Sequence, residues 1–239
     1  MTGSINEKYI LELFDRHLNK VLEYDPYQNF PGAKGRADFC DILAKDPAFA
    51  NFGLNDDRYV IARIGGNLIT SLHRKIGDFY EDVFKYLLQT RFGLPDADLT
   101  YTVLVQIGSR KQKRSTDGVV WAKYLHQDDF RMVPKECARS NGLAFEVRSC
   151  YQIGDSKRIQ ADYDMALALK ANGLTPIMLV FCNTSLRSPI ARLSKSWKLF
   201  QGMDSFAFVR SLTGFDLYNF LETHSAFCKA KINEILSKP

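Results

Sequence analysis

The sequence contains no run of 18 or more apolar residues, and its opening stretch, MTGSINEKYILELF, enters an amphipathic pattern without a basic segment followed by an apolar one. A membrane-spanning helix needs about 20 consecutive, mostly apolar residues. A secretory signal requires a charged and then an apolar segment at the N-terminus. We therefore expect a soluble, cytoplasmic protein with no membrane partner.

Cysteine is scarce and irregularly placed. Five cysteines stand at positions 40, 137, 150, 182 and 228, with no CxxC pair and no histidine at ligand spacing. This argues against a structural zinc site and against a disulfide framework. A reducing compartment suits such a chain.

Other signatures are also missing. No GxxxxGK[ST] loop is present, which argues against a kinase or NTPase. The formal net charge of +5 over 239 residues is too small to indicate nucleic-acid binding by itself, so the position of basic clusters matters more. We find no internal repeat, low-complexity tract or domain linker. With 46% hydrophobic residues, the chain is expected to form one domain over 1–239.

Hydrophobic spacing predicts several secondary-structure elements. Helices are expected over 6–22, over 74–93 with a stop at Gly93 and Pro95, and over 156–171, whose stripe includes Ile159, Tyr163, Ala166 and Leu167. The segment 24–39, with two prolines and two glycines, is predicted to be a loop. Strands are expected over 100–107, 118–124, 143–147 and 175–182, with a polar turn at 108–117. After Phe200, two helices separated at Gly214 are predicted.

The order strand, helix, strand over 143–182 is typical of a right-handed crossover between parallel strands. The fold class expected is therefore α/β, with a mixed central sheet flanked by helices and helical additions at both termini.

Charged side chains accompany one predicted strand. Because strand side chains alternate between faces, Glu146 and Arg148 project together, away from Phe145. A hairpin would bring Asp117 beside Glu146. Two carboxylates with one cation are the minimal set for holding Mg²⁺, which takes a few carboxylate oxygens and keeps several waters. The alternative is a simple salt bridge at the end of the strand.

This order of a helix with an internal Glu, a strand, Asp at a turn and then E-x-R on the next strand resembles the core of the PD-(D/E)xK nucleases. The resemblance spans about 77–182, and "GDSKRIQADYDMALAL" followed by "PIMLVFC" is similar to restriction endonucleases, among them the ApaLI type. It implies a restriction-endonuclease-like core over 70–185, with mainly helical additions over 1–69 and 200–239. It also implies that Asp117 and Glu146 hold the metal, that Arg148 occupies the lysine position, and that Glu81 approaches the ion.

Two residues depart from the family pattern. Thr116 replaces the proline before Asp117, and Arg148 replaces the lysine. A guanidinium stays protonated, so Arg148 cannot act as a general base and is expected to serve as a fixed positive charge. Lys157 is an alternative source of the cation, and Asp155 to Lys157 also match D-x-K, although this segment is typical of a helix start. A third interpretation is an inactivated enzyme.

Basic residues cluster in two places. The first set precedes Asp117 and suits phosphate contacts, and the second follows the buried strand 175–182 and suits the reading of base edges. Solvated surface loops are the simpler explanation for both. The predicted DNA-binding residues are Lys111, Lys113, Arg114, Asn183, Arg187, Arg192 and Lys195.

The resemblance thus implies a Mg²⁺-dependent type II restriction endonuclease that cleaves double-stranded DNA at a specific, palindromic site. A homodimer is expected, because two symmetric strands need two sites. A DNA methyltransferase is the expected partner in the same system. The alternatives are a catalytically impaired DNA-binding protein on the same fold, and a nuclease acting on RNA or branched DNA.

Overall fold

A computed structural model describes residues 4–107, 110–132, 137, 140–151 and 156–237 of the chain. These residues form two compact units. The first unit lies within Met1–Leu13 and Gly77–His224, and the second within Phe14–Ile76 and Ser225–Pro239. Helices α1 (Glu7–Leu22) and α4 (Asp57–Phe92) contribute residues to both units. The prediction of a single domain over 1–239 stays a prediction.

The second unit is helical in its described part, and besides its portions of α1 and α4 it contains α2 (Arg36–Lys45), α3 (Pro47–Ala50) and α9 (Ser225–Leu236). Phe39, Leu43 and Val60 form a small buried cluster there. Asp46 begins α3 by accepting a hydrogen bond from the Ala48 amide, as an N-cap does. None of the helices in the described part of the chain has the length and apolar character needed to cross a membrane.

Helix α4 is longer than the sequence pattern predicts. The apolar stripe indicates a helix over 74–93, and the structure has one from Asp57 to Phe92. Gly65 and Gly66 lower the helix propensity of its first half, so the sequence pattern does not reveal that the helix is continuous. The predicted stop is confirmed, because Gly93 follows with a left-handed φ of 64°.

The first unit is built on a four-stranded mixed sheet with the strand order β3-β4-β5-β6. Its strands are β3 (Gly118–Trp121), β4 (Gly142–Arg148), β5 (Leu174–Val180) and β6 (Lys198–Gln201). Strand β3 runs antiparallel to β4, whereas β4, β5 and β6 are parallel. Helix α5 (Ser156–Ala171) connects β4 to β5, and α6 (Arg187–Leu193) connects β5 to β6. The predicted mixed α/β class is therefore confirmed.

A second, two-stranded sheet corrects one prediction. The polar stretch 108–117 is predicted to be a turn, but β1 (Thr102–Ile107) pairs antiparallel with β2 (Arg110–Ser115). Strand propensity depends on the pairing partner and on burial more than on composition. Val103 and Val105 anchor β1 in the hydrophobic core, so its hydrogen-bonding edge can pair with a strand made entirely of polar residues.

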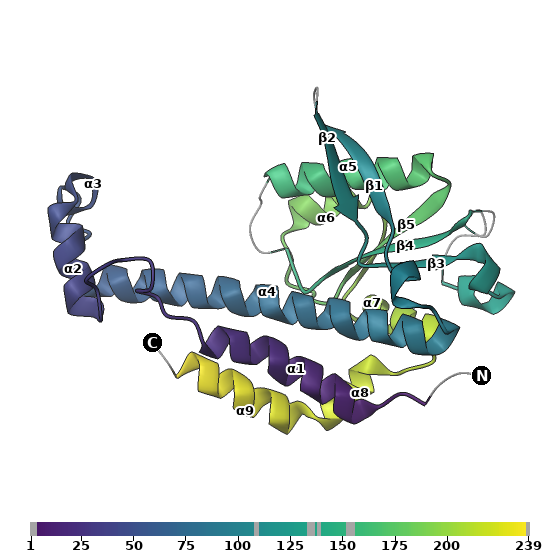
Figure 1. The fold of residues 1–239 in the computed structure, drawn as a ribbon, viewed down its shortest axis with the longest axis horizontal. Helices are drawn as coiled ribbons and strands as arrows, with labels where there is room; N and C mark the ends of the chain where they lie inside the picture. The colour runs from purple at the N-terminus through teal and green to yellow at the C-terminus, as the bar shows by residue number, and fades with distance from the viewer. Residues whose placement is uncertain (1–3, 108–109, 133–136, 138–139, 152–155, 238–239) are drawn as a thin grey trace. The chain divides into compact units, whose positions relative to one another are not determined.

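Helices cover both faces of the four-stranded sheet (Figure 1). On one face, Ala144 and Met178 pack in the core cluster that includes residues of α5. On the other face, Phe145 contacts Phe84 of α4 and Phe208 of α7 (Met203–Thr213). Alternate residues of β4 thus meet different helices, as a strand buried on both faces requires.

Several boundaries differ from those predicted. The strand expected over 118–124 ends at Trp121, and a short 3-10 helix follows over Ala122–Tyr124. The helix expected after Gly214 is divided at His224 into α8 (Leu217–Thr223) and α9. Two further 3-10 helices span Asp96–Asp98 and Gln127–Phe130.

Candidate functional site

Asp117 closes one end of the β3-β4 ladder. It precedes Gly118, whose partner on β4 is Phe145. The Asp117 amide donates to the Phe145 carbonyl at 2.9 Å, and Asp117 Oδ2 accepts from the Val147 amide at 2.8 Å. The side chain thereby satisfies a main-chain donor where the ladder ends. This places Asp117 beside Glu146, as the sequence predicts.

The two carboxylates converge on one guanidinium. Arg148 Nη1 lies 3.4 Å from Asp117 Oδ2, and Nη2 is paired with Glu146 Oε1. Arg148 Nη1 also donates to the Val147 carbonyl at 3.1 Å. The side chains of Asp117 and Arg148 are 13% and 18% exposed, whereas Glu146 is almost fully buried. The group is therefore mostly desolvated but reachable from solvent.

A third carboxylate, which the sequence pattern did not predict, completes what we call the carboxylate-arginine cluster: Asp117, Glu146, Arg148 and Asp162. Asp162 Oδ1 lies 3.6 Å from Arg148 Nη2, and Asp162 is 2% exposed. Asp162 Oδ2 accepts from the Tyr151 hydroxyl at 2.8 Å, and its main-chain carbonyl accepts from Trp197 Nε1 at 2.9 Å.

The phase of α5 explains why Asp162 was missed. The predicted stripe places Tyr163 and Leu167 against the sheet, but both are exposed, at 36% and 45%. The buried face instead carries Ile159, Asp162 and Ala166, three and four residues apart. An acidic residue at helical spacing between two apolar ones was the available signal.

Burial sets the ionisation of the cluster. Burial raises the pKa of Asp117 to about 6, against the Arg148 guanidinium, which lowers it; the Glu81 carboxylate adds to the rise. For Arg148, burial lowers the pKa, but the carboxylates of Asp162 and Asp117 outweigh it and raise the pKa above its usual range. Arg148 therefore stays charged, whereas burial destabilises the charged form of Asp117 more than the guanidinium stabilises it.

Glu81 lies on α4, near enough to Asp117 to influence its ionisation. Its carboxylate pairs with Lys85, one turn along the same helix. Both side chains are partly exposed, at 30% and 24%. Glu81 therefore stands beside the cluster and acts on Asp117 through its charge, while Lys85 is its paired cation.

Lys157, the alternative source of the cation, lies in the first turn of α5, where only its backbone is described, and Asp155 lies outside the described residues. The beginning of α5 at Ser156 agrees with the expectation that this segment starts a helix.

The donor atoms around Arg148 fit a hard divalent cation in type and in charge. Carboxylate and carbonyl oxygens, which Mg²⁺ prefers, come from Asp117, Glu146 and the Val147 main chain. The three carboxylates of the cluster and its one guanidinium leave two negative charges, equal to the charge of one such ion. Within the described residues, no group of three or more His, Cys, Asp or Glu side chains is arranged to hold a metal. A metal ion bound here would therefore be held by two carboxylates, one main-chain oxygen and water.

The first basic set lies on β2. Lys111 and Lys113 are opposite Gln106 and Leu104 of β1, and all four are exposed. Arg114 is opposite the buried Val103, and its guanidinium donates to Gln112 at 3.2 Å. The strand thus separates the predicted residues: Lys111 and Lys113 share one exposed face, and Arg114 lies on the other.

The second basic set is distributed along the connection from β5 to β6. The amide of Asn183 lies against Gly202, where a Cβ would clash with it, so Asn183 is held by the turn after β6. Arg187 begins α6, directly after Leu186, whose amide donates to the Tyr151 carbonyl at 2.8 Å. Tyr151 also contacts Asp162, so Asn183 and Arg187 are at the cluster's end of the sheet. Arg192 is exposed near the end of α6.

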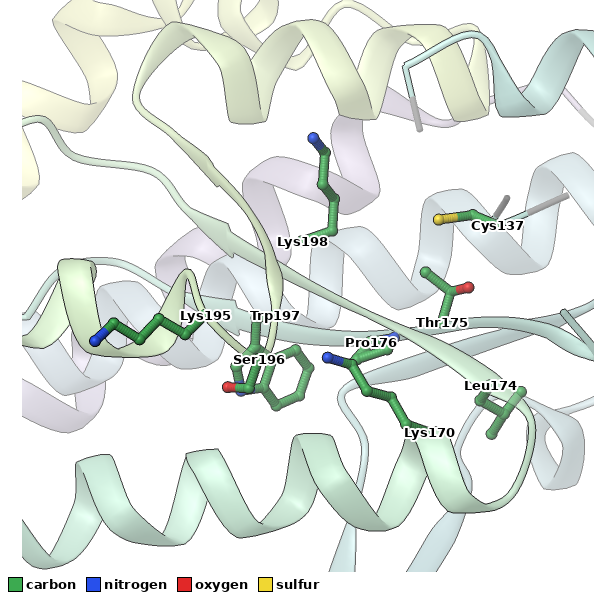
Figure 2. A pocket seen from close by; sticks show the side chains of 9 residues that line it. All are labelled: Cys137, Lys170, Leu174, Thr175, Pro176, Lys195, Ser196, Trp197 and Lys198. Atoms are coloured by element: carbon green, nitrogen blue, oxygen red, sulfur yellow. The ribbon is translucent and has the colours of Figure 1, made fainter. Parts of the chain in front are cut away.

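Lys195 is at the opposite end of the sheet. It lines a pocket of about 310 Å³ together with Lys170 and Lys198, beside the beginning of β5 at Leu174, Thr175 and Pro176 (Figure 2). The ammonium groups of the three lysines point in different directions. Arg148 pairs instead with Val180, at the other end of β5. The structure therefore brings Asp117, Glu146 and Arg148 together but does not bring Lys195 to them.

Comparisons of the chain with protein-family models, with curated proteins and with solved structures found no match.

Proposed function

We propose that the protein is a Mg²⁺-dependent endonuclease that hydrolyses phosphodiester bonds in double-stranded DNA, in the manner of a type II restriction endonuclease. The observation that supports this proposal is the carboxylate-arginine cluster. In it, the carboxylate just before β3 meets the carboxylate of β4, and the three ionised carboxylates outnumber the one guanidinium by two charges. A charge imbalance of this size in a desolvated site is unfavourable, and it is relieved when a cation binds there or when Asp117 takes up a proton below about pH 6.

Each residue has a distinct role in the proposal. Asp117, Glu146 and the Val147 carbonyl would hold the ion, with Glu81 available beside them. The ion, when bound, lowers the pKa of a coordinated water and offsets charge on a phosphate. Arg148 supplies a permanent positive charge for the anionic transition state, because its guanidinium cannot give up a proton at working pH.

The β1-β2 ribbon is the proposed DNA contact. A two-stranded ribbon is narrow enough to enter the major groove. Lys111 and Lys113 on its exposed face would neutralise phosphates, while Gln106 on the same face can reach a base edge. Cleavage of both strands of a palindrome would need two copies of the chain, so the proposal includes a homodimer.

One observation favours a second candidate, a DNA-binding protein without catalytic activity. Arg148 already pairs with both proposed metal ligands, and a guanidinium that stayed there would exclude the ion. This candidate keeps the ribbon and its lysines but predicts no hydrolysis.

Plasmid cleavage in Mg²⁺ tests the proposal. Asp117→Asn and Glu146→Gln preserve side-chain volume and are expected to reduce cleavage by about 100-fold or more, because each removes a group that stabilises the transition state. The matched control is Asp164→Asn on α5, whose carboxylate accepts from Gln160 at 2.8 Å and should leave cleavage unchanged. DNA binding in EDTA is measured in parallel by gel shift.

The outcomes separate the candidates. Cleavage by the natural chain and the control, but not by the two site variants, supports the endonuclease. Gel shifts from all four proteins without any cleavage identify the DNA-binding protein. Cleavage of RNA or branched DNA alone would overturn the choice of substrate.

A further inference from the structure

Arg148 stands between two sets of acceptors. On the strand side it contacts Asp117, Glu146 and the Val147 carbonyl. On the helix side it faces Asp162 of α5 at 3.6 Å, beyond hydrogen-bond distance. The guanidinium therefore has partners on both sides: it donates to Asp117 and to the Val147 carbonyl on the strand side, and on the helix side the Asp162 carboxylate and a hydrogen bond with Tyr151 favour its charged form.

Asp162 is held firmly in place. Its Oδ2 accepts from Tyr151, its main-chain carbonyl accepts from Trp197, and all three residues are at most 4% exposed. Oδ1 is the oxygen that faces Arg148. A short movement of the long arginine side chain toward α5 would convert this approach into a hydrogen-bonded ion pair.

A divalent cation and the guanidinium cannot occupy the same oxygens, because they carry like charges and need the same lone pairs. A guanidinium displaced from Asp117 and Glu146 would be a buried charge without a partner, which is strongly unfavourable. Asp162 removes this penalty, since it offers a second carboxylate on the side away from the strands.

We propose that Arg148 is a built-in competitor of the divalent cation at Asp117 and Glu146, and that Asp162 is the positioning residue that retains the guanidinium when the cation binds. The inference rests on the proposed function, because it takes Asp117 and Glu146 as the metal ligands. It also accounts for arginine at a position where the resemblance leads one to expect lysine.

Mn²⁺ binding without DNA, measured by isothermal titration calorimetry on the full chain, tests the inference. Arg148→Met removes the competitor and is expected to tighten Mn²⁺ binding by about 5- to 150-fold, the usual range for coupling between two sites. Asp162→Asn keeps an acceptor for Tyr151 but removes the charge, and should weaken binding by a similar factor. Asp164→Asn on the same helix is the matched control and should bind as the natural chain does.

The double variant Arg148→Met/Asp162→Asn isolates the mechanism. If Asp162 acts through Arg148, the Asp162 substitution has no effect once the arginine is gone, and the double variant binds like Arg148→Met. A weakening that persists in the double variant means that Asp162 attracts the ion by its own charge, which overturns its positioning role. Thermal unfolding verifies each fold, and Arg148→Gln replaces the Met variant if that one does not fold.

Mn²⁺ binding distinguishes a wrong metal-dependent function from a wrong role for Arg148. If no protein of the set binds Mn²⁺, the proposed metal-dependent function is wrong and this inference falls with it. If the natural chain binds Mn²⁺ and Arg148→Met binds no more tightly, only the competition is wrong.

Discussion

Opposing influences act on the carboxyl group of Asp117. Burial and the Glu81 carboxylate raise its pKa. The Arg148 guanidinium, the hydrogen bond from the Val147 amide and the charge of Lys85 lower it. Burial prevails, and the pKa stands at about 6. Since an unfolded Asp titrates at about 3.9, the native state holds a proton over a pH range in which the unfolded state does not.

This difference predicts the pH dependence of stability. Between about pH 4 and pH 6 the native chain binds more protons at Asp117 than the unfolded chain, so its contribution to the free energy of unfolding disappears as pH rises through about 6. The decrease amounts to at most about 3 kcal/mol. Asp117→Asn lacks this contribution at every pH, so its stability relative to the natural chain should rise between about pH 4 and pH 7 and then stay constant, as measured by urea unfolding.

Titrating groups that do not interact with Asp117 are common to both proteins and cancel in this difference. Saturating Mg²⁺ at about pH 8 should restore stability to the natural chain, by about 2.7 kcal/mol at 100 times its Kd, and leave Asp117→Asn unaffected. Parallel stability curves for the two proteins over this pH range would contradict the raised pKa.

The single residues of the site were only partly predictable. Alternation along a strand is enough to place Glu146 with Arg148, because the period of two is a property of the backbone. Asp162 depends on the phase of α5, and Tyr163 and Leu167 made the wrong face look apolar. Which face of a helix meets the sheet is decided by packing, so the third carboxylate required the structure.

At the scale of elements, the β1-β2 ribbon has the strongest functional consequence. Pairing with β1 turns a cluster of charges into an ordered face, on which Lys111 and Lys113 project together. Counterion release makes each phosphate contact visible in the salt dependence of binding.

We therefore predict that the pair Lys111→Ala/Lys113→Ala lowers the slope of log K against log salt by about 1.8 for duplex DNA, which is near 0.9 for each phosphate that is no longer neutralised. The control pair, Lys170→Ala/Lys198→Ala, removes the same charge from the pocket at the other end of the sheet. Fluorescence anisotropy at several salt concentrations measures both slopes. A larger change of slope for the control pair would indicate that the DNA binds at the end of the sheet where the pocket lies.

At the scale of the whole molecule, two helices join the compact units. Residues of α1 and α4 belong to both, so neither unit can unfold completely without breaking a helix of the other. Cooperative unfolding as one domain is the expected consequence.

The two tryptophans make this testable. Trp121 and Trp197 both belong to the first unit, so their fluorescence follows that unit, whereas far-ultraviolet circular dichroism follows the helices of both. We expect coincident urea transitions from the two probes and a calorimetric enthalpy equal to the van't Hoff enthalpy. Separate midpoints would indicate two domains.

The sequence by itself determined the α/β class, the parallel pairing of β4 and β5, the helix stop at Gly93, and the meeting of Asp117 with Glu146. These features follow from local periods and from short connections, which the chain carries in its own residue spacing. Only the tertiary structure decided the strand at Arg110–Ser115, the full length of α4, the role of Asp162 and the separation of Lys195 from the cluster. The strand at Arg110–Ser115 depends on its neighbour β1, which Val103 and Val105 anchor in the core, and the other three features depend on how segments distant in the sequence pack, so burial outweighs local composition in each case.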